Sequence, residues 1–176
     1  LTSNQVKALT VEQVAAISTA GIATMSDTQF AAFSAAQIPS LTAAQVGAIT
    51  SANLAVMPTA SLRAFTSDQI VALRPTQVSN LTTDQIKAIT TSQLPALGTD
   101  DINVLTSHQV GALTDDQLQT LSVSQVQAIA SGSLKTLSSD QIQTLSTEQL
   151  AGMSSSQIRG FQYTQIPAFS SDQISN

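Results

Sequence analysis

The sequence predicts an all-α fold, a solenoid or superhelix of 22 eight-residue repeats, each forming a short capped helix of about one turn. Three observations predict it. The 176 residues divide into octads without an insertion, large apolar residues return at positions 1 and 6, and a Ser or Thr at position 2 usually precedes a Gln at position 5. Because one octad is too short to enclose a core, we expect several octads to complete each coil.

The apolar columns define the expected core, which is aliphatic because only 3% of the residues are aromatic. Position 1 is Leu, Ile, Phe or Met throughout, position 6 is mostly Ile or Val, and position 8 is most often Ala. Burying two large side chains yields roughly 3–6 kcal/mol, whereas ordering eight backbones costs on the order of 8–16 kcal/mol. Neighbouring octads must therefore share one core. In octads 81–88 and 89–96 its expected members are Leu81, Ile86, Ala88, Ile89, Leu94 and Ala96.

Each octad carries the signals that begin a helix. A Ser or Thr followed three residues later by Gln is a capping box, as in Thr82 with Gln85 and Thr90 with Gln93. The apolar residues at positions 1 and 6 then form a hydrophobic staple. Acidic residues fall at positions 3 to 5 and most basic ones at position 7, the order that the helix dipole favours. A helix should therefore begin after position 2 of every octad.

The same octad also carries stop signals. Pro39, Pro95 and Pro167 all occupy position 7, where proline removes a hydrogen bond and disfavours helical geometry at the preceding residue. A single long helix is disfavoured by these prolines and because its apolar stripe would rotate by about 80° per octad. A β-solenoid is the other alternative, since position 6 is rich in β-branched residues. It is disfavoured because the glycines are spread over five columns instead of marking a fixed corner.

Composition excludes several classes of protein. The net charge is −5 and the six basic residues are scattered, which argues against nucleic-acid binding. The chain has no cysteine, no signal-peptide pattern and no apolar run that could cross a membrane. Residues 1–176 are expected to form one repeat domain. Since the chain opens inside the repeat, we expect it to be a fragment of a longer array.

No residue pattern predicts an enzyme, so we expect no catalytic, cofactor-binding or metal-binding residue. His108 is the only histidine, and it occupies a variable position expected at the surface. The pairs Asp115–Asp116 and Asp100–Asp101 could bind calcium or act as acid and base, but charges in the first turn of a helix explain them. The serines have no His–Asp partners, and the Thr column, although regular enough for an ice-binding face, is expected to cap helices.

A few departures from the repeat remain. Five octads lack Gln at position 5, and their spacing, near five octads, could mark one edge of the coil (Gly21, Asn53, Ser61, Asp101 and Ser133). The Gln column could form ladders between coils, but its capping role suffices to explain it. Arg74, the one base outside position 7, and Tyr163 each break the pattern once and could belong to a patch for a partner.

The octads LTTDQIKA (81–88) and LSSDQIQT (137–144) resemble repeat arrays in very large bacterial secreted or cell-surface proteins. This resemblance covers the whole chain and implies a repetitive segment of an adhesin-like protein, with no catalytic residue. LTVEQVAAI (9–17) and LTAAQVGAI (41–49) also resemble the helix openings of TAL-effector DNA-binding repeats. Eight residues leave no room for the base-reading loop of those repeats, so DNA recognition is set aside.

The predicted function is structural: a rigid spacer or stalk in a secreted surface protein, or a subunit of an extracellular fibre. The alternative is a protein-binding solenoid that uses the variable positions 3, 4 and 7. Since both ends finish inside the repeat, we also expect head-to-tail self-association. The expected location is extracellular or at the cell surface, with no membrane insertion.

Overall fold

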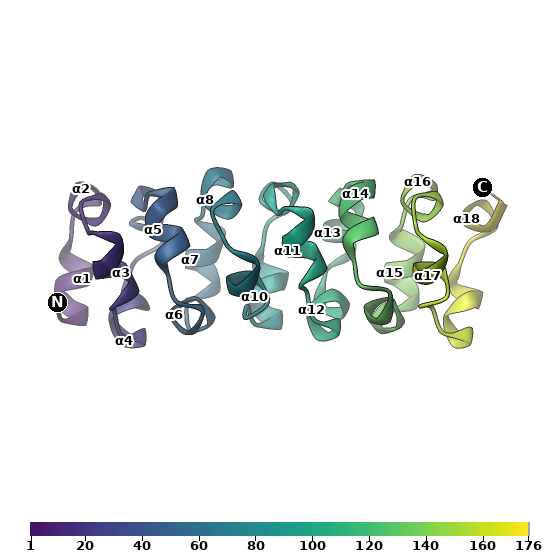
Figure 1. Ribbon diagram of the computed structural model, residues 1–176, viewed down its shortest axis with the longest axis horizontal. Helices are drawn as coiled ribbons and strands as arrows, with labels where there is room; N and C mark the ends of the chain where they lie inside the picture. The colour runs from purple at the N-terminus through teal and green to yellow at the C-terminus, as the bar shows by residue number, and fades with distance from the viewer. Residues whose placement is uncertain (176) are drawn as a thin grey trace. The chain divides into compact units, whose positions relative to one another are not determined.

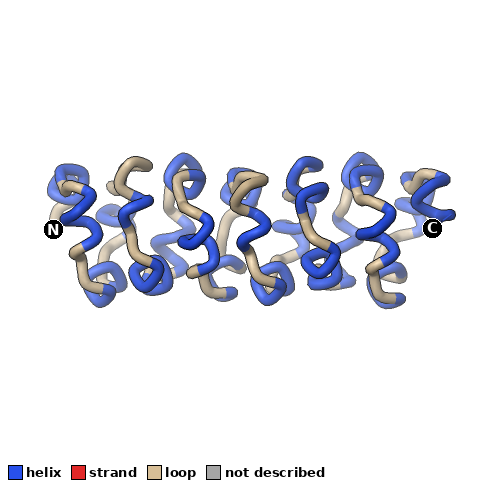
Figure 2. The backbone as a smooth tube through the Cα atoms, turned by 90° about the horizontal axis from the view of Figure 1, so that it is seen from above, coloured by secondary structure: helices blue, strands red, loops and turns tan. Residues whose placement is uncertain are grey.

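The computed structural model describes residues 1–175. Over this range the regular elements are short α-helices and 3-10 helices, and none is a strand (Figures 1 and 2). The all-α prediction is therefore confirmed, and the β-solenoid alternative is wrong. None of these helices combines the length and apolar character that crossing a bilayer requires.

The chain forms two compact units, Leu1–Ala96 and the described residues from Leu97 onward. The helices of the first unit, purple to teal in Figure 1, are α1 (Ser3–Ala8), α2 (Val11–Ala15), α3 (Thr19–Ala23), α4 (Asp27–Phe30), η1 (Ile38–Ser40), α5 (Ala43–Ala48), α6 (Ser51–Ala55), α7 (Thr59–Arg63), α8 (Ser67–Val71), α9 (Pro75–Val78), α10 (Thr83–Ala88) and η2 (Leu94–Ala96). Those of the second are α11 (Thr99–Asn103), α12 (Ser107–Ala112), α13 (Asp115–Thr120), α14 (Val123–Ala128), η3 (Ser131–Thr136), α15 (Ser139–Thr144), α16 (Thr147–Ala151), α17 (Ser155–Ile158), η4 (Tyr163–Ala168) and α18 (Ser171–Ser175).

The α-helices, η3 and η4 begin after position 2 of their octads, as the sequence predicts, whereas η1 and η2 begin only at position 6. In α5, for example, Thr42 is extended, with φ −72° and ψ 158°, and its side chain accepts from the Gln45 N–H. The Gln45 side chain accepts from the Thr42 N–H in return, which completes the capping box. Ile49 then returns to extended geometry, with φ −60° and ψ 130°. Positions 1 and 2 of the octads thus supply the extended links drawn in tan in Figure 2.

The prolines at position 7 shorten the helix in two of the three octads, since η1 and η2 have three residues each whereas η4 has six. Pro39, Pro95 and Pro167 lie in the 3-10 helices η1, η2 and η4, where other octads form α-helix. The octad of η3 has no proline, but Ala130 stands at its cap position and makes no side-chain cap bond. Pro58 and Gly98 also make no side-chain cap bond, yet α7 and α11 are α-helical, so a missing cap alone does not explain the 3-10 geometry of η3.

The predicted core is confirmed at positions 1 and 6. Leu81, Ile86, Ile89 and Leu94 are at most 4% exposed, and Ala88 is buried beside them. Ala96 is only half-buried, so position 8 contributes less to the core than positions 1 and 6 do. No described residue has a positive φ, so the links need no glycine, which agrees with the scatter of glycines in the sequence.

Hydrogen bonds between coils define how many octads complete one turn. Gln37 Nε2 donates to the Val6 carbonyl, 31 residues upstream, and to the Leu9 carbonyl, 28 residues upstream. The same two separations recur in the second unit, where Gln149 bonds Leu118 and Leu121. A coil therefore takes between three and a half and four octads. The spacing near five octads does not match this period, so the expectation that it marks one edge of the coil is wrong.

Candidate functional site

The position-5 glutamines are the most regular functional feature of the chain. Gln45 is 2% exposed and uses both ends of its amide. Its Oε1 accepts from the Thr42 N–H within its own octad. Its Nε2 donates to the Val14 carbonyl at 2.9 Å and the Ile17 carbonyl at 2.6 Å in the preceding coil. One side chain therefore caps its own helix and joins two coils.

This arrangement repeats through both units. The buried glutamines that bond the preceding coil include Gln37, Gln45, Gln69, Gln77, Gln85, Gln93, Gln125, Gln141, Gln149, Gln157 and Gln165. Over residues 1–175, no buried side-chain polar atom is left without a hydrogen bond. The ladder that the sequence suggested is therefore present, and the view that capping alone explains the Gln column is incomplete. A buried amide needs all its partners, because an unpaired one would cost about 1–3 kcal/mol.

Asp101 shows what an acid does at position 5. It is 6% exposed, and its Oδ2 accepts from the Gly98 N–H at 2.9 Å. Burial raises the pKa of the Asp101 carboxyl, the Gly98 N–H lowers it, and the neighbouring charge of Asp100 raises it, with a net shift upward. Both aspartates lie in the first turn of α11, as the sequence predicts, but they differ because Asp100 is exposed and Asp101 is buried.

The other residues considered from the sequence lie apart from one another. His108, Asp115 and Asp116 are exposed. Within the described chain, no three His, Cys, Asp or Glu side chains gather closely enough to hold a metal ion. Tyr163 is 90% exposed and lies outside the grooves described below.

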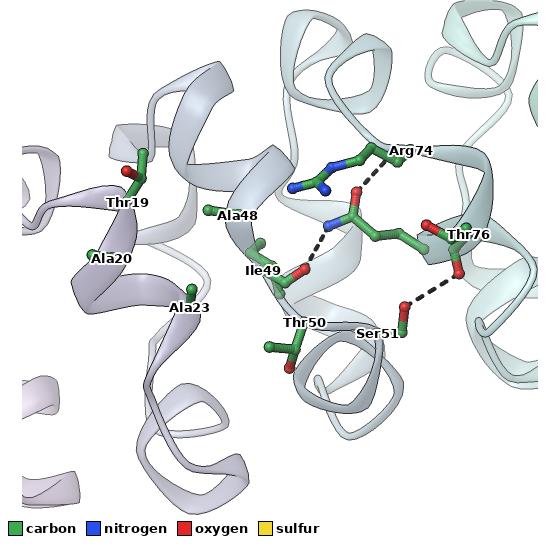
Figure 3. Close-up of a pocket in the computed structure, with 10 residues that line it drawn as sticks. Thr19, Ala20, Ala23, Ala48, Ile49, Thr50, Ser51, Arg74 and Thr76 are labelled. Carbon is green, nitrogen blue, oxygen red and sulfur yellow. Dashed lines mark hydrogen bonds between the residues drawn. The ribbon is translucent and has the colours of Figure 1, made fainter.

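Arg74 lies in a groove of about 540 Å³ within the first unit (Figure 3). Three successive coils build it. The lining residues are Thr19, Ala20 and Ala23 from α3, Ala48, Ile49, Thr50 and Ser51 from the link between α5 and α6, and Arg74, Thr76 and Gln77 at the start of α9. One of these ten residues is basic and none is acidic, so the groove carries a positive charge.

Two further hollows lie on core faces left open by the first and last coils. A groove of about 470 Å³ in the second unit is lined mostly by apolar side chains, including Ile158, Ile166 and Ile174. These three residues occupy position 6, which is buried elsewhere, yet they are 48%, 48% and 66% exposed. In the first unit, Leu1 and Met25 line a smaller hollow of about 230 Å³.

A family model described as the ALTTAQ repeat matches residues 46–83, 81–115, 95–131 and 126–162, which together extend from 46 to 162. The six letters correspond to positions 8 and 1 to 5 of the octad, as in ALTDDQ at 112–117. They therefore describe the stretch that links one helix to the next and caps it. A search of curated proteins found no match.

Proposed function

This chain belongs to the ALTTAQ repeat family, and we propose that it acts as a rigid spacer or stalk in a secreted or cell-surface protein, or as a subunit of an extracellular fibre. The amide ladder is the observation that carries this proposal. The same hydrogen bonds hold coil to coil in each unit, and side-chain positions that differ between octads point outward. Uniform cross-links of this kind favour a mechanical role over a single catalytic centre.

Stiffness is the property that tests the spacer proposal. The chain has no cysteine, so a pair introduced at exposed positions, Glu12→Cys with Asp140→Cys, would be the only sites that take spin labels. A rigid spacer predicts a narrow distance distribution by pulsed electron paramagnetic resonance. The pair Glu12→Cys with Thr91→Cys, both within the first unit, is the matched control. A broad distribution for the first pair with a narrow one for the control would refute a rigid spacer.

Exposed apolar side chains favour a spacer over a protein-binding solenoid. Away from the open faces of the first and last coils, the large exposed ones are Val11, Val56, Val71 and Tyr163, and they occupy separate octads. A docking surface for a protein usually presents such residues as one contiguous patch. Binding through positions 3, 4 and 7 therefore has less support than a mechanical role.

Head-to-tail association between copies of this chain is part of the proposal. The amides of Gln5 and Gln13 are exposed, and within residues 1–175 each caps its own helix and bonds no other coil. The position-6 side chains Ile158, Ile166 and Ile174 are exposed on the last coil. Stacking the first coil of one copy on the last coil of another would cover both faces with the contacts found inside each unit.

Light scattering tests this association. We expect the average mass to rise with concentration, and Ile166→Lys to keep the protein monomeric because it places a charge within the stacked core. Val71→Lys, at an equally apolar but isolated exposed site, should associate as the unchanged protein does. A monomer at every concentration, or equal effects of the two substitutions, would refute end-to-end stacking.

A further inference from the structure

The Arg74 groove lies where one position, Ala23, lacks the side chain that closes the equivalent place in the second unit. In the second unit, Gln127 at position 7 reaches the next coil and donates from Nε2 to the Gly152 carbonyl at 2.6 Å, 25 residues downstream. The equivalent pair in the first unit is Ala23 and Ala48, also 25 residues apart. Alanine cannot bridge the coils, so the surface stays open between α3 and α5 (Figure 3).

The walls of this groove are held in place by hydrogen bonds. Gln77 accepts from the Arg74 N–H at 2.7 Å and donates to the Ile49 carbonyl at 2.8 Å. Ser51 Oγ donates to the Thr76 carbonyl at 3.2 Å. The dashed lines of Figure 3 mark these three bonds, of which the first lies within one coil and the other two connect the coils beneath the groove. The groove is therefore formed before any ligand arrives, which reduces the ordering cost of binding.

The Arg74 guanidinium is available to a ligand. Its side chain extends across the groove toward Ala48 in Figure 3, and over residues 1–175 it makes neither a hydrogen bond nor an ion pair within the chain. A Cβ at Gly47 would lie 3.9 Å from Arg74 Nε, so the small residue beside the guanidinium leaves it room. An arginine with five unused donors presents a planar fork that matches a carboxylate.

The other residues that line the groove limit the kinds of ligand that it can bind. Within the described chain, the hydroxyls of Thr19 and Thr76 are exposed and have no partner, so both can donate and accept. The methyl groups of Ala20, Ala23 and Ala48 form an apolar wall opposite Arg74. No aromatic ring lines the groove, so a nucleobase would have no aromatic side chain to stack on. Hydroxyls, methyls and one guanidinium together match the hydroxyl groups, C–H face and charge of an acidic sugar.

We propose that this groove binds a short acidic saccharide through a carboxylate on Arg74, with sugar hydroxyls on Thr19 and Thr76. One guanidinium balances one carboxylate, whereas a phosphate dianion would keep an uncompensated charge because the groove offers no second cation. A volume of about 540 Å³ suits two or three sugar rings and falls within the range of small-ligand sites.

The probe that tests this proposal is aldotriouronic acid, a trisaccharide with a single carboxylate. Its binding is followed by the NMR signals of the Arg74 side-chain Nε–H and of the backbone amides of Thr19, Ser51 and Thr76. We expect saturable shifts at these residues with a dissociation constant in about the millimolar range. A neutral xylose trisaccharide, acetate and inorganic phosphate are the comparison ligands. No saturable shift with aldotriouronic acid, or equal shifts with any comparison ligand, would overturn the proposal.

Two substitutions separate the charge from the shape of the groove. Arg74→Ser returns position 2 to the usual capping residue, so it should fold and weaken binding at least tenfold. Ala23→Gln places the bridging side chain of the second unit in the groove and should weaken binding similarly with the charge intact. Arg63→Ser removes an exposed charge outside the groove and should leave binding unchanged. If Arg63→Ser weakens binding as much as Arg74→Ser does, the attraction depends on net charge and the groove is not the site.

Discussion

Changing Gln45 to glutamate isolates the bond between coils from the bond that caps the helix. A glutamate has the same length and can still accept from the Thr42 N–H. It cannot donate to the carbonyls of Val14 and Ile17, which Gln45 Nε2 contacts at 2.9 and 2.6 Å. The substitution therefore keeps the capping box and removes only the link to the preceding coil.

The expected cost follows from these contacts. The carbonyls of Val14, Ala15 and Ile17 lose their donor, and a carboxylate becomes buried beside them with no cation. We therefore expect Gln45→Glu to destabilise the protein by about 3–5 kcal/mol at neutral pH. Gln13→Glu is the matched control, because Gln13 occupies the same position, makes the same capping bond with Thr10 and is exposed. An exposed carboxylate in the first turn should change stability by less than about 0.5 kcal/mol.

Urea unfolding followed by circular dichroism, at several pH values, measures both effects. Burial raises the pKa of the introduced carboxyl in the folded state above its unfolded value of about 4.3. The deficit relative to the unchanged protein should therefore be smallest below that value and grow as pH rises through the folded pKa. The reasoning is refuted if Gln45→Glu costs no more than Gln13→Glu, or if its deficit is the same at acidic and neutral pH.

Two further substitutions test burial and close packing in the second unit. Asp101→Asn should stabilise the protein at neutral pH, because burial raises the pKa of this carboxyl and so disfavours its charged form. Thermal melts should show the gain shrinking as the pH falls through the raised pKa and lost below the ordinary pKa of aspartate, and a gain independent of pH would contradict this. Gly160→Ala should destabilise the protein by about 1–3 kcal/mol, since its Cβ would lie 2.2 Å from the Ser131 carbonyl oxygen. Gly132→Ala, which meets nothing within 4 Å, is its control, and equal melting temperatures for the two would count against the packing argument.

Local features could be predicted from the sequence because one octad contains all the groups that determine them. The capping box of Thr82 and Gln85 and the shortened helix at Pro95 depend on residues at most a few positions apart. Burial at positions 1 and 6 could also be predicted from the sequence, because only at those two positions is the residue large and apolar in every octad. These features could be predicted without knowing how one coil packs on the next.

Features that join coils could not be predicted in the same way. The partners of Gln45 are Val14 and Ile17, and their separation depends on the angle between successive octads, which no single octad specifies. The groove at Arg74 likewise brings together residues from α3, α5 and α9. Arg74 stood out in the sequence as the one base outside position 7. The residues around it could not be predicted without knowing how many octads complete one coil.

The octads that have another residue at position 5 explain why glutamine is the usual residue at this position. Asn53 is one methylene shorter: its Nδ2 reaches the Met25 carbonyl at 2.9 Å, but it does not complete a capping box with Thr50. Asp101 makes the opposite compromise, since it accepts from the Gly98 N–H but has no N–H of its own to donate. Glutamine alone has both the length and the two kinds of polar atom that the two bonds require. A column of glutamines three residues after a capping hydroxyl, in a repeat too short to enclose its own core, therefore predicts hydrogen bonds between coils as well as helix starts.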